Sequence, residues 1–286
     1  MKATPLSIHP QAVVSPRAQV GRRVSIGPFC LVEDDVRLGD GCRLESHVVV
    51  RRGTTLGADN HLSAGVVIGG TAQHLLAGET HGNLVIGSRN TLRENCTIHR
   101  ALRPGDATVI GDDNYLMVNS HVAHDCRIGD HTVLANNVML AGHVTIEDRA
   151  FLSGAVGVHQ FCRVGRHAMV GGQARVCQDV LPFVLIDGEC TKVVGLNRVG
   201  LRRHGFTREE MVQLKAAYDL IYRSELAWRE VLQRLHTDFA EGPAACLYDF
   251  CRDAGRGIVQ QRRAPPTPTL KLHRADAPPS HRAKAG

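Results

Sequence analysis

Aromatic residues and long apolar runs are scarce in this chain of 286 residues. Only 4% of the residues are Phe, Trp or Tyr, and there is a single Trp. No stretch approaches the roughly 18 apolar residues of a membrane span, and the N-terminus lacks the apolar core of a signal peptide. We therefore expect a cytoplasmic protein with no stable membrane insertion.

Cysteine spacing typical of metal or redox sites is also missing, although the chain has nine cysteines. No pair follows the Cys-x-x-Cys spacing that such sites use. Five cysteines instead fall at the small position of a six-residue repeat, where a free thiol acts as a small hydrophobic group: Cys30, Cys42, Cys96, Cys126 and Cys162. We expect these five thiols to be buried and unpaired.

Net positive charge is small outside the C-terminal segment 262–286. The formal net charge is +6, and this segment holds six Lys or Arg against one Asp, which leaves +1 for the rest of the chain. That balance argues against a basic nucleic-acid-binding face on the folded part. Five of the twelve prolines also lie in 262–286, so we expect a disordered basic tail there.

What the sequence does contain is an aliphatic residue at every sixth position. Of the 29 positions from 8 to 176 taken in steps of six, 26 hold Val, Ile or Leu. The exceptions, His74, Thr80 and Pro104, predict loops at 70–84 and 101–108. A period of six fits neither a helix nor an ordinary strand and is typical of a hexapeptide-repeat parallel β-helix. Three hexads form one coil, so residues 18 apart lie above one another.

After position 176 the sixfold pattern gives way to helical spacing. Thr207 and Glu210 have the spacing of a capping box at the start of a helix. The segment 195–205 before them is expected to be a loop. The sequence thus predicts a β-helix over 1–190, a small α-helical domain over 191–261, and the tail.

The 18-residue spacing gathers histidines, an aspartate, a glutamine and a glycine of neighbouring coils at one corner of the prism. They are His121, His124, Asp125, Gly142, His143, His159 and Gln160. Histidine suits a general base acting on a hydroxyl near neutral pH, and Asp125 is placed to orient His124 or a neighbouring imidazole. The backbone N–H of Gly142 could reach an oxyanion on an acyl carbonyl. Because Cys126 is expected in the lumen and no other nucleophile is poised, direct attack of an acceptor hydroxyl on a thioester is favoured.

Two other interpretations of the histidines stay open at this point. The histidines could simply lie on a solvent-exposed face without a catalytic role. Alternatively, three imidazoles could bind a catalytic Zn²⁺ and leave one coordination position open. Zinc fits poorly, because its ligands converge at about 2 Å on one point, whereas His124 and His159 are two coils apart. We therefore expect no bound metal.

Several strings of residues point to a family in their order and spacing. They include Asn119-x-His121-Val122-Ala123-His124-Asp125-Cys126, Leu140-Ala141-Gly142-His143-Val144, Val158-His159-Gln160-Phe161 and Ile221-Tyr222-Arg223-Ser224. Over about residues 5–258 the chain resembles the acyl-[acyl-carrier-protein]–UDP-N-acetylglucosamine O-acyltransferases. The resemblance implies a left-handed all-β helix followed by α-helices, and a homotrimer with active sites between subunits. It also implies transfer of a 3-hydroxyacyl chain from acyl carrier protein to the sugar 3-hydroxyl, the first step of lipid A biosynthesis, with no cofactor beyond that donor.

The same resemblance implies roles for individual residues. His124 would be the general base with Asp125 beside it, and Gly142 would stabilise the oxyanion. The residues expected to contact the UDP-sugar acceptor are Gln73, His121, His143, His159, Gln160, Asn197 and Arg203. Gly154 and Gly172 would line the acyl chain, and the acidic carrier protein would dock on Arg202 and Arg203.

The chain departs from the family pattern where the acceptor binds. His74 and Leu76 replace an acid and a lysine in the first loop, and Val199 and His204 replace a Glu and an Arg. The residues of the catalytic corner are unchanged. A paralogue that acylates another nucleotide sugar, for example a 3-amino sugar, is therefore an alternative, as is a non-catalytic hexapeptide trimer.

Overall fold

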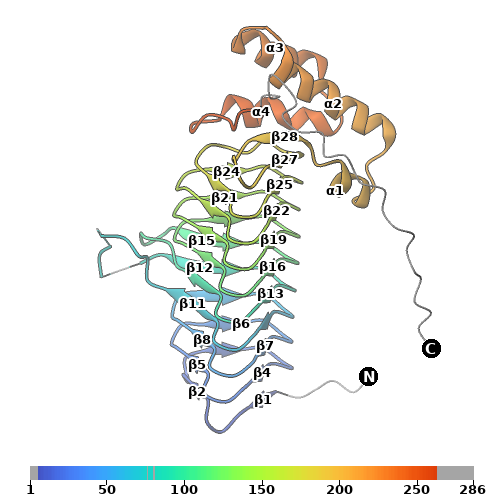
Figure 1. Cartoon of the computed structure of the whole chain (residues 1–286). Helices are drawn as coiled ribbons and strands as arrows, with labels where there is room; N and C mark the ends of the chain where they lie inside the picture. Colours follow the sequence, from blue (N-terminus) through green and yellow to red (C-terminus); the bar gives the residue numbers. More distant parts are fainter. Residues whose placement is uncertain (1–5, 76, 80, 263–286) are drawn as a thin grey trace, which may run out of the picture.

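The computed structural model describes residues 6–75, 77–79 and 81–262 of the chain. Short strands stack in successive coils and form the three faces of a prism. In Figure 1 the prism rises from the N-terminal coil to a group of helices at its C-terminal end. Apart from Arg262, the expected basic tail lies outside the described residues.

Each full coil contributes one strand to each of three sheets. The first sheet contains β1 (Ser7–Ile8), β4 (Ser25–Ile26), β7 (Arg43–Leu44), β10 (His61–Leu62), β13 (Thr91–Leu92), β16 (Tyr115–Leu116), β19 (Val133–Leu134), β22 (Phe151–Leu152), β25 (Met169–Val170), β27 (Val184–Ile186) and β28 (Val193–Leu196). The second sheet contains β2 (Val13–Val14), β5 (Leu31–Val32), β8 (Val49–Val50), β11 (Val67–Gly70), β14 (Thr97–His99), β17 (His121–Val122), β20 (Met139–Leu140), β23 (Gly157–Val158) and β26 (Arg175–Val176). The third sheet contains β3 (Gln19–Val20), β6 (Arg37–Leu38), β9 (Thr54–Leu56), β12 (Asn83–Ile86), β15 (Ala107–Ile110), β18 (Arg127–Ile128), β21 (Thr145–Ile146) and β24 (Arg163–Val164).

The pairing register confirms the coil length and shows how the loops fit into it. Ile128 pairs with Ile146 in parallel, a step of 18 residues. Across the first loop Leu56 pairs with Ile86, a step of 30, and across the second Ile86 pairs with Ile110, a step of 24. The first loop therefore adds two hexads to its coil, and the second loop adds one. Because both insertions are whole hexads, the aliphatic positions after each loop still point into the lumen.

The first loop is shorter than the expected 70–84. Gly70 ends β11 and Asn83 begins β12, so the connection covers 71–82. It projects from the side of the prism next to β11 and β12 (Figure 1).

The second loop covers 100–106 and not 101–108, because β15 begins at Ala107. Asn83 and Leu84 at the start of β12 pair with Ala107 and Thr108 at the start of β15, where the two loops end. Backbone groups that a loop would leave unpaired are thereby hydrogen-bonded within the third sheet.

The lumen is filled by the aliphatic positions and by the small residues two positions before them. The five cysteines predicted there are buried and free, and burial raises the pKa of Cys126 to about 12. A ladder of buried asparagines was not predicted. Asn60 Oδ1 accepts hydrogen bonds from the backbone N and the Nδ2 of Asn90, both at 3.0 Å, and Asn90 Oδ1 accepts from Asn114 N at 2.8 Å.

Each corner of the prism repeats one backbone conformation. The third residue after an aliphatic position has φ near +60°, as at Asp125 (+60°), His143 (+60°) and Phe161 (+65°). Asn, Asp and Gly adopt this left-handed region most readily, which explains their frequency at the corners. Because the geometry repeats, side chains at equivalent corner positions of successive coils lie one above another.

Helices cover the C-terminal end of the prism (Figure 1). They are α1 (Arg198–Arg203), α2 (Arg208–Arg223), α3 (Trp228–Asp238), the 3₁₀ turn η1 (Pro243–Ala245) and α4 (Cys246–Arg252). The predicted capping box at Thr207 and Glu210 is confirmed. The expected loop at 195–205 is wrong, because Asn197 Oδ1 accepts from Gly200 N and caps α1. Within the described part of the chain, every helix is too short or too polar to cross a membrane.

One arginine joins the prism to the helices. Arg163 Nε lies 3.0 Å from Asp179 Oδ2, and its Nη2 donates to the Phe250 carbonyl at 2.6 Å. The guanidinium also lies over the Phe250 ring, 4.1 Å from the centroid. Strand β28 lies beyond the expected domain boundary at residue 190 and pairs antiparallel with β27, so the first sheet continues toward the helices.

Candidate active site

The predicted column of His124 and Gly142 lies at the corner that follows the second sheet. Strands β17, β20 and β23 stack there with an 18-residue register. A Cβ on Gly142 would lie 2.6 Å from His124 Cε1 and 2.7 Å from its Nε2, which is closer than real Cβ atoms approach other atoms. Glycine at 142 is therefore needed for the imidazole of His124 to take this position.

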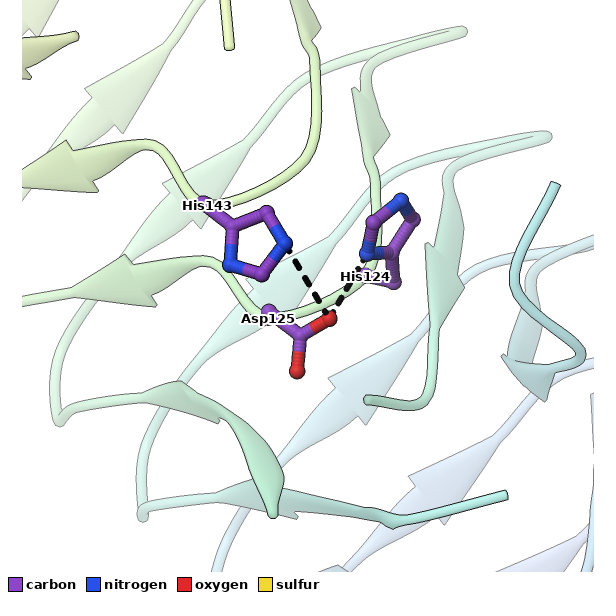
Figure 2. A group of neighbouring side chains, drawn as sticks. All are labelled: His124, Asp125 and His143. Atoms are coloured by element: carbon purple, nitrogen blue, oxygen red, sulfur yellow. Dashed lines mark hydrogen bonds and ion pairs between the residues drawn. The ribbon is translucent and has the colours of Figure 1, made fainter. Parts of the chain in front are cut away.

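A carboxylate fixes the orientation of His124. Its Nδ1 lies 2.7 Å from Asp125 Oδ2, and the two side chains are only 9% and 10% exposed. Since a carboxylate accepts, Nδ1 carries the proton of the neutral ring and Nε2 keeps a lone pair. Figure 2 shows His124 and His143 on either side of this carboxylate. The lone pair at Nε2 is thus held next to the Gly142 backbone.

The second loop and the strand β15 that follows it hold Asp125 in place, a role that the sequence did not reveal. Leu102 N donates to Asp125 Oδ2 at 3.2 Å, and Asp125 N donates to Thr108 Oγ1 at 2.8 Å. The extra hexad of this coil therefore provides a backbone donor for the carboxylate that orients His124.

His143 lies on the outer side of the same carboxylate. Its Nε2 is 3.8 Å from Asp125 Oδ2, and its side chain is 40% exposed (Figure 2). The ring stacks on Phe161 with centroids 4.7 Å apart and meets the His124 ring edge-on at 5.2 Å. His143 thus contacts the same carboxylate from its solvent-exposed side.

A cavity of about 490 Å³ opens along this corner. Its lining includes six predicted site residues, namely Gln73, His121, His124, Gly142, His159 and Gln160. His74 also lines it, and its ring meets the His124 ring edge-on with centroids 5.6 Å apart. A larger cavity of about 730 Å³ lies between β28, α1 and α2. It contains none of the predicted catalytic residues, so the smaller cavity is the candidate site.

His121 belongs to a pair of neutral histidines. Its Nδ1 lies 2.8 Å from Thr97 Oγ1, and its ring meets His99 edge-on at 4.8 Å. Burial lowers the pKa of His121. Burial, with the nearby His121 and His124, lowers the pKa of His99 to about 4. Neither ring therefore adds positive charge to the cavity at neutral pH.

Arg256 determines the state of His159 and was missed by the sequence analysis. Its Nη2 lies 3.1 Å from His159 Nδ1. A guanidinium only donates, so Nδ1 accepts and Nε2 carries the proton. The Gln160 carbonyl, 3.2 Å from the same nitrogen, would favour the opposite tautomer, but the permanent charge of Arg256 decides between them. His159 therefore presents an N–H, whereas His124 presents a lone pair.

A metal could use a different set of ligands from the three imidazoles weighed from the sequence. The ligand atoms of His124, Asp125 and His143 lie within 4.8 Å of one another (Figure 2). Two ligands of a tetrahedral zinc with bonds of about 2.0–2.1 Å are roughly 3.3 Å apart. The 2.7 Å between His124 Nδ1 and Asp125 Oδ2 is a hydrogen-bond distance instead, so the geometry fits a proton better than a zinc ion.

Family models match two parts of the chain. One described as UDP N-acetylglucosamine O-acyltransferase, domain 2, matches residues 179–259, and one described as bacterial transferase hexapeptide (six repeats) matches 107–142. The chain is 42% identical over 260 residues to the acyl-[acyl-carrier-protein]–UDP-N-acetylglucosamine O-acyltransferase of Verminephrobacter eiseniae, covering 89% of this chain and 99% of that protein. The chain belongs to this family.

Solved structures agree with that assignment. The UDP-N-acetylglucosamine acyltransferase of Francisella novicida is 35% identical with a TM-score of 0.86, over 89% of this chain and 94% of that one. The UDP-N-acetylglucosamine O-acyltransferase of Moraxella catarrhalis is 37% identical with a TM-score of 0.85, over 88% and 99%. The expected fold, a left-handed parallel β-helix followed by a small α-helical domain, is confirmed.

Four residues that the family resemblance adds to the site lie away from the His124 cavity within one chain. Gly154 and Gly172 stack at the corner after the first sheet, where a Cβ on Gly172 would lie 3.3 Å from Gly154 O. Asn197 caps α1 and donates from Nδ2 to His167 O at 2.9 Å. Arg203 is exposed in the last turn of α1. A single chain therefore does not gather all the residues expected in the site.

A second histidine pair lies beside Asn197, at the corner after the third sheet. His167 Nδ1 and His204 Nδ1 are 3.1 Å apart. The His167 ring stacks on Phe183 at 5.8 Å and meets Phe206 edge-on at 5.1 Å. Burial, and then the neighbouring His204, lower the pKa of His167 to about 4. His204 is thus packed against a neutral imidazole.

Proposed function

We propose that this chain transfers a 3-hydroxyacyl group from acyl carrier protein to the 3-hydroxyl of UDP-N-acetylglucosamine, the first step of lipid A biosynthesis, in the cytoplasm. The observation that carries the proposal is the His124–Asp125 pair, whose free Nε2 lies beside Gly142 in one cavity. The names of the curated relatives support the same reaction.

The proposed mechanism needs one base and one hydrogen-bond donor. His124 Nε2 takes the proton of the acceptor hydroxyl while the oxygen attacks the thioester carbonyl, and Asp125 stabilises the imidazolium that forms. The Gly142 N–H stabilises the oxyanion of the tetrahedral intermediate. Collapse of that intermediate breaks the C–S bond, and the leaving sulfur takes the proton back from His124. The reaction therefore needs no metal and no cofactor beyond the carrier-bound acyl donor.

The base and the oxyanion donor each make a contribution of known size in other enzymes. A positioned general base contributes typically about 10²–10⁴-fold, and one oxyanion donor about 10²–10³-fold. Among the described residues, the Gly142 N–H donates to no other group of the chain, so it is free to meet the substrate. His159, with its proton at Nε2, is placed to donate to the acceptor.

A homotrimer is part of this proposal. Gly154, Gly172, Asn197 and Arg203 are separated from the His124 cavity within one chain, and a neighbouring subunit would bring a second set of them to it. The outward positions of the second sheet support such a contact, because its lower strands present Val13, Leu31, Val49 and Val67 in register. Light scattering after size exclusion should give three times the chain mass.

The carrier protein would approach from the helical end. Arg202 and Arg203 are exposed at the end of α1. The 730 Å³ cavity beside them is lined by further cations, including Arg198, Arg208 and Lys215. This surface is complementary in charge to an acidic carrier protein.

A second candidate acceptor follows from His74. An imidazole lies edge-on to the His124 ring where the family has an acid. Imidazole can donate or accept, whereas a carboxylate only accepts. An acceptor with a 3-amino group in place of the 3-hydroxyl is therefore the alternative.

An assay of the purified protein decides between these acceptors. It would combine 3-hydroxyacyl carrier proteins of several chain lengths with UDP-N-acetylglucosamine, its 3-amino analogue and UDP-glucose, and identify products by mass spectrometry. We expect an ester at the 3-hydroxyl of UDP-N-acetylglucosamine. Amide formation with the 3-amino sugar alone would change the acceptor and keep the mechanism. No transfer to any of the three would contradict the proposed function.

A further inference from the structure

Arg175 is the one permanently charged side chain among the described residues that line the His124 cavity. The remaining lining consists of histidines, two glutamines, a cysteine, and apolar or small residues, with no carboxylate. A nucleotide-sugar acceptor carries its negative charge on the diphosphate. Arg175 is therefore the cation of the cavity that could bind the diphosphate.

The register of the second sheet fixes where Arg175 lies relative to the catalytic corner. Its outward residues pair in the order His121, Met139, Gly157 and Arg175. With strands about 4.8 Å apart, the α-carbons of His121 and Arg175 are separated by roughly 14 Å. An extended arginine side chain spans roughly 6 Å, from bond lengths near 1.5 Å. The guanidinium can therefore cover somewhat less than half of the distance back toward His121.

Gly157 leaves room for a ligand directly below Arg175. A Cβ built on Gly157 would have no atom within 4 Å, so the row of outward side chains has a gap between Met139 and Arg175. The edge of this gap carries the His159 N–H, and Arg256 behind His159 adds a second positive charge. An anion in the gap would meet donors from more than one side.

The guanidinium of Arg175 is available for such a ligand. Its backbone N–H donates to Thr191 Oγ1 at 3.1 Å, but within the described residues its side chain makes no hydrogen bond or ion pair. It is exposed. A free arginine fork binds phosphate oxygens in a bidentate manner.

We propose that Arg175 binds the diphosphate of the nucleotide-sugar acceptor and thereby sets its direction in the cavity. The sugar lies over His124 and Gly142, and the phosphates lie over Gly157 toward β26. Arg175 then supplies a cation that the first loop does not, since residues 71–82 contain no Lys or Arg. This inference rests on the proposed function for the identity of the ligand.

Calorimetric titration of the purified protein with UDP alone tests the contact without any turnover. We expect Arg175→Gln to weaken UDP binding about tenfold, with Arg175→Lys in between, and uridine binding to be equal in all proteins. Arg127→Gln is the matched control, because Arg127 is an exposed outward arginine on β18 of the third sheet, and it should bind UDP like the wild type. Equal UDP affinity in Arg175→Gln and the wild type would overturn the inference.

Steady-state kinetics separates the two phosphate-bearing substrates and the two proposals. Arg175→Gln should raise KM for the nucleotide sugar about tenfold and change KM for the acyl carrier protein less than twofold. An increase in the carrier KM alone would assign Arg175 to the phosphopantetheine phosphate and overturn the inference. If the wild type transfers to no nucleotide sugar while Arg175→Gln still weakens UDP binding, the proposed function fails and the inference stands.

Discussion

Two corners of the prism hold a histidine with a close partner, and the partners differ in kind. His124 Nδ1 lies 2.7 Å from the carboxylate of Asp125, whereas His167 Nδ1 lies 3.1 Å from Nδ1 of another histidine, His204. His124 is buried and His167 is half-buried, and each lies at a corner that follows a strand of the prism. The difference in partner decides what each imidazole can do.

A carboxylate and an imidazole impose different constraints on a histidine. Asp125 can only accept, so the proton of His124 stays on Nδ1 and the lone pair faces the cavity. His204 can donate or accept, and burial together with Arg149 lowers its pKa as well. Phe183 and Phe206 pack on the His167 ring. The first corner is arranged for proton transfer, and the second is a packed, neutral contact between the prism and the segment that follows α1.

The largest effect is expected from removing the base itself. His124→Ala should lower kcat about 10³-fold, within the range for loss of a general base, with little change in thermal stability. His131→Ala is the matched control, since His131 is an exposed corner histidine of the same prism, and it should retain wild-type kcat. A kcat for His124→Ala within tenfold of the wild type would show that the two corners do not differ in the way proposed.

Removing the negative charge of the partner should have the next largest effect. Asp125→Asn should lower kcat on the order of a hundredfold, because an amide can present its NH₂ group to His124 and favour the wrong tautomer. The hydrogen bond from Leu102 N to Oδ2 would also weaken. The measurement is kcat alongside the melting temperature, and a variant that folds normally and keeps full kcat would contradict the orienting role.

The prism and the His124 column could be predicted because both follow from a fixed period. A lumen that accepts only aliphatic and small side chains forces a hydrophobic residue at every sixth position, and adding 18 to a residue number then identifies its neighbour. His124 and Gly142 meet for that reason. The loop bounds were less accurate, because Gly70, Asn83 and Ala107 join strands by pairing across the loops.

The remaining contacts of the site could not be predicted because no period relates their members. Arg256 reaches His159 across 97 residues, and the Leu102 N–H reaches Asp125 from a loop whose conformation the repeat does not specify. The short helix α1 is capped by a local hydrogen bond, from Gly200 N to Asn197 Oδ1. Such contacts depend on how separate segments pack, which a one-dimensional pattern does not contain.

The corner that holds His167 and His204 should make the stability of the protein depend on pH. The pKa of His167 is about 4 in the native state and about 6.5 when unfolded. Between these values the unfolded chain binds more protons, so the free energy of unfolding falls as the pH falls from 6.5 to 4 and is unaffected above 6.5. One pKa unit is about 1.4 kcal/mol, so with partial solvent screening we expect a loss of about 1–2 kcal/mol.

The test is urea unfolding of the wild type and of His167→Asn at pH 7.5 and pH 4.5. The variant can be less stable at both values, but its loss of stability between them should be smaller than that of the wild type. His99 also has a pKa lowered to about 4 and contributes to the same pH dependence. His99→Asn should therefore also make the loss of stability between pH 7.5 and pH 4.5 smaller than in the wild type. An unchanged slope in both variants would mean that these rings are not held neutral by the fold.

The smallest effect, close to none, is expected from metal removal. His124, Asp125 and His143 could converge on an ion, yet Nδ1 of His124 lies at hydrogen-bond distance from Asp125, closer than two zinc ligands lie to each other. Dialysis against a chelator should therefore leave kcat within twofold of the untreated enzyme, and metal analysis should find far less than one zinc per chain. If chelation abolished activity and zinc restored it, Asp125 would be a ligand and not an orienting base. The two corners would then differ by a metal ion and not by the tautomer of a histidine.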